Sequence, residues 1–257
     1  MQIGISTASF YPLYTERGLA KLASWGVPAA EVFINCAAEL EEDYLKEQRR
    51  AADDAGMRIL SVHPYTSGQE PLLFFSAYKR RLAEGMELYR RYCHAANLLG
   101  AEVVVFHGDR DGSAISEGER FHRMGELIRM GRGMGVDICQ ENVVRCVSRQ
   151  PAFFVRLAEA VPEARFVYDI KQARMAGEDV YDFAETLGGR IAHLHLSDHD
   201  ATRPCLPPGE GKMDYPRLFR ILERSGFDGG GVVELYRDNF AGEDELRGAW
   251  AHLRSLA

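Results

Sequence analysis

The stretch IAHLHLSDHD, residues 191–200, places His193 and His195 on one parity and Leu194 and Leu196 on the other. Successive side chains of a β-strand point to opposite faces, so the two histidines share one face and the two leucines share the other. The segment therefore predicts a strand that carries imidazoles along its buried face, and the function of the protein has to account for them.

Composition argues against several classes of protein. The chain has 257 residues and a formal net charge of −7, whereas a nucleic-acid-binding protein usually carries a basic face. No apolar run approaches the ~18 residues of a membrane span, and residues 1–10 lack the pattern of a signal peptide. The five cysteines are scattered without CxxC spacing, which argues against a disulfide framework or a cysteine zinc cluster. We expect a cytoplasmic protein with no nucleic-acid or membrane partner.

Strand-like runs alternate with amphipathic segments along the whole chain. The amphipathic segments with the clearest helical spacing cover residues 78–100, 151–161, 214–226 and 244–256, and Gly100 is well placed to end the first of them. The expected strands cover residues 2–6, 29–34, 58–65, 101–108, 136–142, 164–170, 190–196 and 230–236.

Eight strand–helix units in about 250 residues are typical of a (β/α)8 TIM barrel. A doubly wound sheet is the alternative, but no GxGxxG follows the first strand. No linker, low-complexity tract or block of charge divides the chain, so we expect one domain over residues 1–257.

Six successive expected strands end on a side chain that can bind a metal ion or move a proton. In a barrel of this class, the carboxyl ends of the strands carry the active site. A packed core would not gather three carboxylates, because unpaired buried charges cost several kcal/mol each. The six residues are His63, His107, Glu141, Asp169, His195 and Glu234.

Glu141, Asp169, His195 and Glu234 form the most economical set of ligands for one divalent metal ion. Three carboxylates and one imidazole favour Mn²⁺ or Mg²⁺, with Co²⁺ or Zn²⁺ as alternatives. His193 lies one layer deeper than His195, and we interpret it as a core residue or a support for the site.

The ordered motifs at these strand ends resemble the xylose isomerase-like TIM barrels, which include sugar-phosphate isomerases and epimerases and, as a nuclease branch, endonuclease IV. The resemblance covers nearly the whole chain. It implies the same four metal ligands and a substrate pocket lined by His63 and His107. The motifs are SVHPY, VVFHGD, CQENV, VYDIKQA, HLHLSDHD, PPGEGKMDY and GGVVELY.

Two departures from the family pattern bear on the reaction. The family often has a histidine three residues after Asp169, where this chain has Gln172. The nuclease branch has Asp-x-His before the Gly-x-Gly segment, where this chain has Arg203 and Cys205. Three ligands of a multinuclear zinc cluster are therefore missing, which points to an enzyme with a single metal ion.

The expected reaction is a sugar or sugar-phosphate isomerisation or epimerisation through an enediolate. A divalent metal stabilises the enediolate as a Lewis acid, and Glu141 and Glu234 serve both as ligands and as the acid/base pair. Lys171, which shares the parity of Asp169, and Arg203 are the cationic candidates for holding substrate. The Gly-x-Gly at residues 209–211 is either a phosphate-binding loop or a turn.

Three alternatives remain open from the sequence. A keto-cyclitol dehydratase of the inosose type uses the same metal–enolate chemistry. An abasic-site nuclease like endonuclease IV is disfavoured by the net charge and the missing ligands. A sugar-binding barrel without activity would have no use for a complete ligand set. The expected partner is a small sugar, sugar phosphate or cyclitol; the sequence leaves open the substrate, the metal and assembly into a homo-oligomer.

Overall fold

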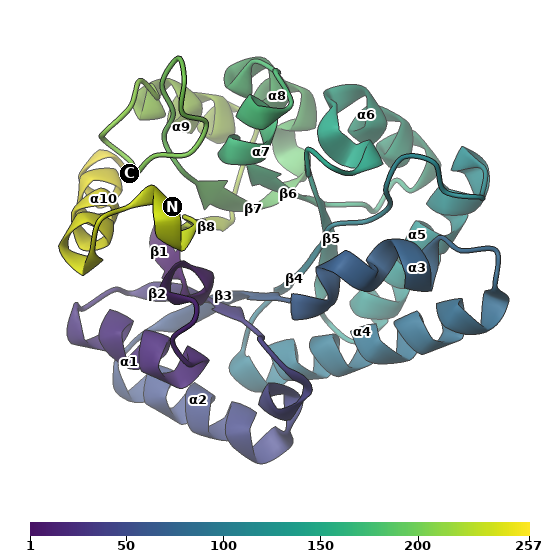
Figure 1. Cartoon of the computed structure of the whole chain (residues 1–257), viewed down its shortest axis with the longest axis horizontal. Helices are drawn as coiled ribbons and strands as arrows, with labels where there is room; N and C mark the ends of the chain where they lie inside the picture. Colours follow the sequence, from purple (N-terminus) through teal and green to yellow (C-terminus); the bar gives the residue numbers. More distant parts are fainter.

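The computed structural model describes residues 1–257 and contains eight parallel strands that close into a barrel (Figure 1). The strands follow each other around the barrel in chain order, and the last pairs with the first from Gln2↔Gly230 to Ile5↔Val233. Closure of this kind confirms the (β/α)8 barrel and excludes the doubly wound sheet. The strands are β1 (Gln2–Ser6), β2 (Ala29–Phe33), β3 (Arg58–His63), β4 (Val103–Phe106), β5 (Asp137–Glu141), β6 (Phe166–Asp169), β7 (Ile191–Leu196) and β8 (Gly230–Val233).

Helices surround the strands on the outside of the barrel (Figure 1). All four helical segments expected from spacing are present, and Gly100 ends the first of them with a left-handed φ of 73°. None of the helices is both long enough and apolar enough to cross a membrane. The α-helices are α1 (Thr15–Ser24), α2 (Glu42–Asp54), α3 (Glu70–Phe74), α4 (Lys79–Leu99), α5 (Glu117–Gly133), α6 (Pro151–Ala160), α7 (Ile170–Met175), α8 (Val180–Leu187), α9 (Tyr215–Arg224) and α10 (Glu243–Leu256).

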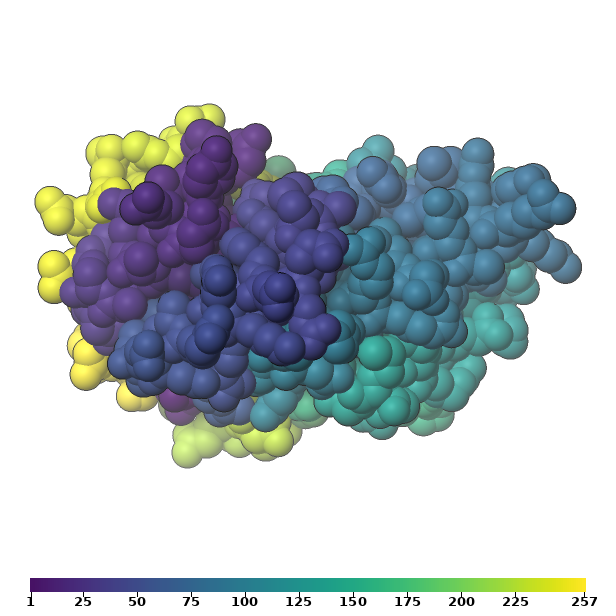
Figure 2. All heavy atoms as spheres, turned by 90° about the horizontal axis from the view of Figure 1, so that it is seen from below, coloured from purple at the N-terminus to yellow at the C-terminus, as the bar shows by residue number.

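The two ends of the chain meet on one side of the molecule. Figure 2 shows the purple N-terminal segment beside the yellow C-terminal segment. Trp250 of α10 donates a hydrogen bond from its indole nitrogen to the Ile3 carbonyl of β1, at 2.9 Å. The last helix therefore binds to β1, one of the two strands whose pairing closes the barrel.

The strands are buried on both faces, as expected for parallel strands covered by helices. Every residue of β7 is buried, and Leu194 and Leu196 belong to the large apolar core. The histidines alternate with the leucines as expected: His193 and His195 point into the barrel and contact polar groups there, whereas the leucines point outward to the helices.

Two register shifts bring polar side chains of neighbouring strands into line. Between β6 and β7, Phe166 pairs with Ile191 but Val167 pairs with His193, which leaves one extra residue in β7. Asp169 consequently pairs directly with His195. A similar shift between β2 and β3 places Ser61 opposite Glu31. Bulges of this kind re-aim side chains and are common beside functional sites.

Candidate active site

The six polar residues expected at strand ends all lie at the carboxyl end of the barrel. Three of them are the last residue of their strand, one is the last but one of β7, and two directly follow β4 and β8. The strand-ending residues are His63, Glu141 and Asp169, the residue of β7 is His195, and the two that follow a strand are His107 after β4 and Glu234 after β8.

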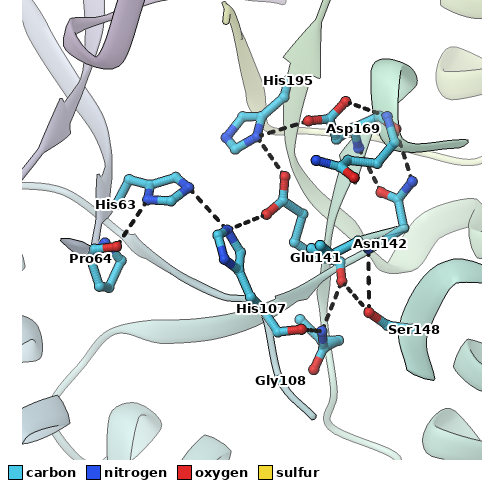
Figure 3. Close-up of polar contacts among 12 residues, drawn as sticks. His63, Pro64, His107, Gly108, Glu141, Asn142, Ser148, Asp169 and His195 are labelled. Atoms are coloured by element: carbon cyan, nitrogen blue, oxygen red, sulfur yellow. Dashed lines mark hydrogen bonds and ion pairs between the residues drawn. The ribbon is translucent and has the colours of Figure 1, made fainter. Parts of the chain in front are cut away.

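Three carboxylates surround one imidazole nitrogen at the centre of the site. His195 Nδ1 lies 2.9 Å from Glu141 Oε1, 3.4 Å from Glu234 Oε2 and 3.8 Å from Asp169 Oδ2. The four residues each offer one donor atom, and these atoms all lie within 4.8 Å of one another. Figure 3 shows dashed contacts from one nitrogen of this imidazole to the side chains of both Glu141 and Asp169.

The donor set fits a divalent cation. Asp169 Oδ1 accepts the backbone N–H of Gln172 at 3.0 Å, which fixes the carboxylate. Its other oxygen, Oδ2, is buried, faces the centre and accepts no hydrogen bond. Lys171 Nζ lies 3.3 Å and His195 Nδ1 lies 3.8 Å from this oxygen, so its charge is partly compensated but the oxygen is still open to a cation, and hard oxygen ligands are what Mn²⁺ and Mg²⁺ prefer.

The imidazoles and carboxylates of this buried site keep one another charged by electrostatic attraction. Burial alone would lower the pKa of His195, but the surrounding carboxylates, Glu234 foremost, raise it well above its usual value. Burial acts to raise the pKa of Glu141, yet two neighbouring imidazoles hold it well below its usual range. Asp169 differs, because burial raises its pKa more than Lys171 lowers it. The proton on His195 is therefore the positive charge that a bound cation would displace.

A pair of histidines flanks Glu141. His107 Nε2 lies 2.7 Å from Glu141 Oε2 and 3.2 Å from His63 Nε2 (Figure 3). Burial lowers the pKa of His63, whereas Glu141 raises the pKa of His107 despite burial. These three residues form a second group of donor atoms within 4.8 Å of one another.

A cavity of 570 Å³ opens above the central cluster, a size that suits a small ligand. Five of the expected site residues line it, whereas Asp169 and His195 are buried behind its wall, each 1% exposed. The expected residues on its wall are His63, His107, Glu141, Lys171 and Glu234; the others are Ala8, Tyr11, Phe33, Ser67, Arg145, Gln172, Leu235, Tyr236, Arg237 and Asp238.

Lys171 reaches the site from a helix instead of from a continued strand. β6 ends at Asp169, and Lys171 lies in the first turn of α7. Its Nζ lies 3.0 Å from Glu234 Oε2 and 3.3 Å from Asp169 Oδ2. The ammonium also sits 4.3 Å from the ring centre of Tyr236, which leaves it buried but facing the carboxylates.

Arg203 does not join the other expected residues. Its guanidinium binds the carboxylate of Asp200 through Nε at 2.8 Å and Nη2 at 2.7 Å, and the side chain is 61% exposed. Because its guanidinium is already paired with the carboxylate of Asp200, Arg203 lies on the surface and does not line the cavity. Arg145 and Arg237 are the arginines that line the cavity.

The Gly-x-Gly segment packs against Asp198. Gly209 N donates to Asp198 Oδ2 at 3.0 Å, and a Cβ on Gly211 would lie 2.2 Å from Asp198 Oδ1. Glycine is required here by the approach of a carboxylate, and the backbone N–H of Gly209 is already used. The segment is therefore a turn built on Asp198.

Sequence reasoning missed two residues at this end of the barrel. Glu31 of β2 is fully buried, and its Oε2 lies 3.1 Å from His195 Nε2. A charged residue in the middle of the apolar run AAEVFI was the available signal. Arg145 lies four residues beyond β5, and no pattern distinguished it from a surface arginine.

The xylose isomerase-like TIM barrel family matches residues 19–256. Fructoselysine 3-epimerase of Shigella flexneri is 23% identical over 252 residues, which cover 91% of this chain and 90% of that protein. A D-tagatose 3-epimerase-like protein has a similar structure, with a TM-score of 0.81, 21% identity and coverage of 100% of this chain and 97% of that one.

The similarity also extends to a different reaction class. The probable 3-DHS dehydratase of Bacillus anthracis superposes with a TM-score of 0.76 and 15% identity, covering 100% of this chain and 98% of that one. At these identities the structural likeness shows the fold alone. The family match extends over most of the chain and confirms the resemblance inferred from the strand-end motifs: the protein belongs to the xylose isomerase-like TIM barrel family.

Proposed function

We propose that this protein is a metal-dependent sugar or sugar-phosphate epimerase or isomerase. The observation that carries the proposal is the pair Glu141 and Glu234, two carboxylates on the wall of one cavity that both contact His195 Nδ1. The similarity to fructoselysine 3-epimerase and to a D-tagatose 3-epimerase-like protein supports this reaction class.

Glu141, Asp169, His195 and Glu234 would hold one divalent metal ion, with Mn²⁺ or Mg²⁺ favoured by the three carboxylates and Co²⁺ or Zn²⁺ as alternatives. When bound, the metal supplies Lewis-acid polarisation of the substrate carbonyl.

Glu141 and Glu234 carry the proton transfer. Glu141 is the last residue of β5 and Glu234 directly follows β8; these strands are three positions apart in the eight-stranded barrel, so the two carboxylates approach a substrate from different sides. One carboxylate removes the proton next to the carbonyl, and the electron pair of the broken C–H bond forms an enediolate. The other glutamate, which has taken a proton from its neighbour (His107 for Glu141, Lys171 for Glu234), delivers that proton to the opposite face and inverts that carbon; solvent then reprotonates the neighbour.

Neighbouring cations tune the two carboxylates and hold the substrate. His107 lies 2.7 Å from Glu141, and Lys171 lies 3.0 Å from Glu234, so each carboxylate has a positively charged or proton-bearing partner. With His63, these groups line the cavity and bind substrate oxygens.

Arg145 takes the substrate-binding role expected of Arg203. Its Nη2 lies 3.4 Å from His107 Nδ1 on the cavity wall, and no carboxylate lies within ion-pair distance. One charge-assisted hydrogen bond to substrate is worth about 1.5–3 kcal/mol, so we expect Arg145→Gln to raise KM at least ~10-fold. Steady-state kinetics of the matched variant Arg203→Gln should stay within about twofold of the parent. Equal effects of both substitutions would contradict this assignment.

A screen with metal-loaded protein tests the proposed reaction. The purified chain, supplied with Mn²⁺, is incubated with ketoses, ketose phosphates and keto-cyclitols, and the products are separated by chromatography. An epimer or an aldose–ketose pair at equilibrium is the expected product. Turnover of none of these compounds, with bound metal demonstrated, would count against the proposal.

A keto-cyclitol dehydratase is the second candidate, favoured by the structural similarity to a probable dehydratase. Both reactions begin by removing a proton next to a carbonyl. They differ in that a dehydratase expels a hydroxyl from the neighbouring carbon, so an ultraviolet-absorbing enone product would identify it.

We expect no cleavage of abasic DNA. Gln172 uses its side-chain oxygen to accept the Val144 N–H, and Cys205 is buried, so neither provides the ligand that the nuclease branch uses. The net charge of −7 also repels phosphate at low salt. The measurement is incubation with an abasic-site duplex alongside a repair nuclease; cleavage at a comparable rate would overturn the assignment.

A further inference from the structure

Glu31 is a buried carboxylate that the proposed proton transfer does not use. It lies on β2 with 0% exposure and does not line the cavity. A buried charge persists only where hydrogen bonds satisfy it. Its Oε1 accepts from Ser6 Oγ at 2.9 Å and its Oε2 from Ser61 Oγ at 2.7 Å, while His195 Nε2 lies 3.1 Å from Oε2.

We propose that Glu31 is a positioning residue that orients His195 for metal binding. The two ring nitrogens of His195 face different groups: Nε2 faces Glu31, and Nδ1 faces the three carboxylates of the central cluster. A hydrogen bond on one ring nitrogen fixes which nitrogen is left to bind a metal. Glu31 thus keeps a proton on Nε2 and leaves Nδ1 to the cation. This inference rests on the proposed function, because it requires His195 to be a ligand.

The carboxylate of Glu31 is itself held in place from two sides. Ser6 on β1 and Ser61 on β3 come from the strands on either side of β2. The register shift between β2 and β3 places Ser61 directly opposite Glu31. Since each serine binds a different oxygen, the carboxylate cannot rotate without losing a hydrogen bond.

The deeper histidine of β7 belongs to the same arrangement. His193 Nε2 lies 3.0 Å from Ser61 Oγ and 3.4 Å from Glu31 Oε2. The Ser61 hydroxyl has one proton, which it donates to Glu31, so its oxygen accepts the proton of His193 Nε2. Both imidazoles on the inward face of β7 therefore donate toward Ser61 and Glu31 inside the barrel, whereas the leucines that alternate with them pack in the apolar core.

Metal affinity tests the role of Glu31 without relying on turnover. The chain is freed of metal with a chelator, and Mn²⁺ is titrated into the parent, Glu31→Gln and Ser6→Ala by calorimetry. Loss of such a partner typically weakens metal binding about 10–100-fold, so the Kd of Glu31→Gln should rise by that factor. Ser6→Ala is the graded comparison, because it removes the support of Oε1 but leaves the contacts of Oε2 with Ser61 and His195; its Kd should rise by about threefold at most, less than that of Glu31→Gln.

Activity provides a second readout that a purely structural role would not give. The activity lost in Glu31→Gln should return as Mn²⁺ is raised, because His195 remains present but is badly oriented. Circular dichroism and metal-free melting establish that each variant is folded. Should Glu31→Gln not fold, Glu31→Asp withdraws the carboxylate by one methylene while keeping its charge, and the same rise in Kd is expected.

Three results would overturn the inference. The Kd of a folded Glu31 variant could equal that of the parent, or Ser6→Ala could weaken binding as much as Glu31→Gln. The third is a lower number of bound ions at unchanged affinity, which would mean that Glu31, His193 and His195 hold an ion of their own. If the parent binds no Mn²⁺ at all, the proposed function fails instead, so the two failures are distinguishable.

Discussion

Replacing Glu141 by glutamine is expected to lower kcat by about 10³-fold, within the range supplied by a positioned acid or base. Glutamine has nearly the same shape, but it has lost the negative charge and one of the two acceptor oxygens. In the native site Oε1 contacts His195 Nδ1 at 2.9 Å and Oε2 contacts His107 Nε2 at 2.7 Å, so both oxygens are used. The variant therefore loses a metal ligand and a proton carrier in one change.

Single-turnover and steady-state kinetics on an identified substrate measure this effect. Glu126→Gln is the matched control, because Glu126 is a half-exposed residue of α5, outside the cavity wall, whose carboxylate pairs with His122 at 3.8 Å. Its kcat should be unchanged. Near-native activity of Glu141→Gln would show that Glu141 is neither ligand nor acid/base.

Removing the metal ion is expected to abolish activity and to lower the melting temperature. Without the cation, the carboxylates of Glu141, Asp169 and Glu234 face one another in a buried site and are compensated by His195, Lys171 and His107 alone. A ligand present at 100 times its Kd stabilises the folded state by about 2.7 kcal/mol. For a chain of this size that corresponds to a shift of about 5–10 °C.

Elemental analysis, chelation and thermal melting check this prediction together. We expect one metal ion per chain and full recovery of activity when Mn²⁺ or Mg²⁺ is returned after chelation. Two ions would implicate the second group formed by His63, His107 and Glu141. Three zinc ions, or activity unaffected by a chelator, would contradict a site with a single catalytic metal.

The strand-end residues could be predicted because they depend on local pattern. A short apolar run that is followed by a carboxylate or imidazole, such as Val103–Phe106 before His107 or Gly230–Val233 before Glu234, marks a candidate for the mouth of a barrel. The face that His193 and His195 share follows from strand parity alone. Fold and central cluster therefore follow from features within single strands.

The features that sequence reasoning missed depend on contacts between segments. Glu31 has a role only because a register shift sets Ser61 beside it, and such shifts arise from pairing between strands. Arg203 and Arg145 are both loop arginines, and their placement depends on the nearest carboxylate: Asp200 binds the first, whereas no carboxylate binds the second. Lys171 reaches the site because a helix begins directly after Asp169.

Exchange of a substrate proton with solvent deuterium tests the central claim most directly. The metal-loaded protein is incubated in D₂O with the substrate identified by the screen, and the position next to the carbonyl is followed by NMR. Incorporation of deuterium at that carbon, dependent on metal and lost in both Glu141→Gln and Glu234→Gln, is the result this account predicts. Epimerisation or isomerisation without any incorporation of deuterium, or incorporation that persists in both variants, would contradict it.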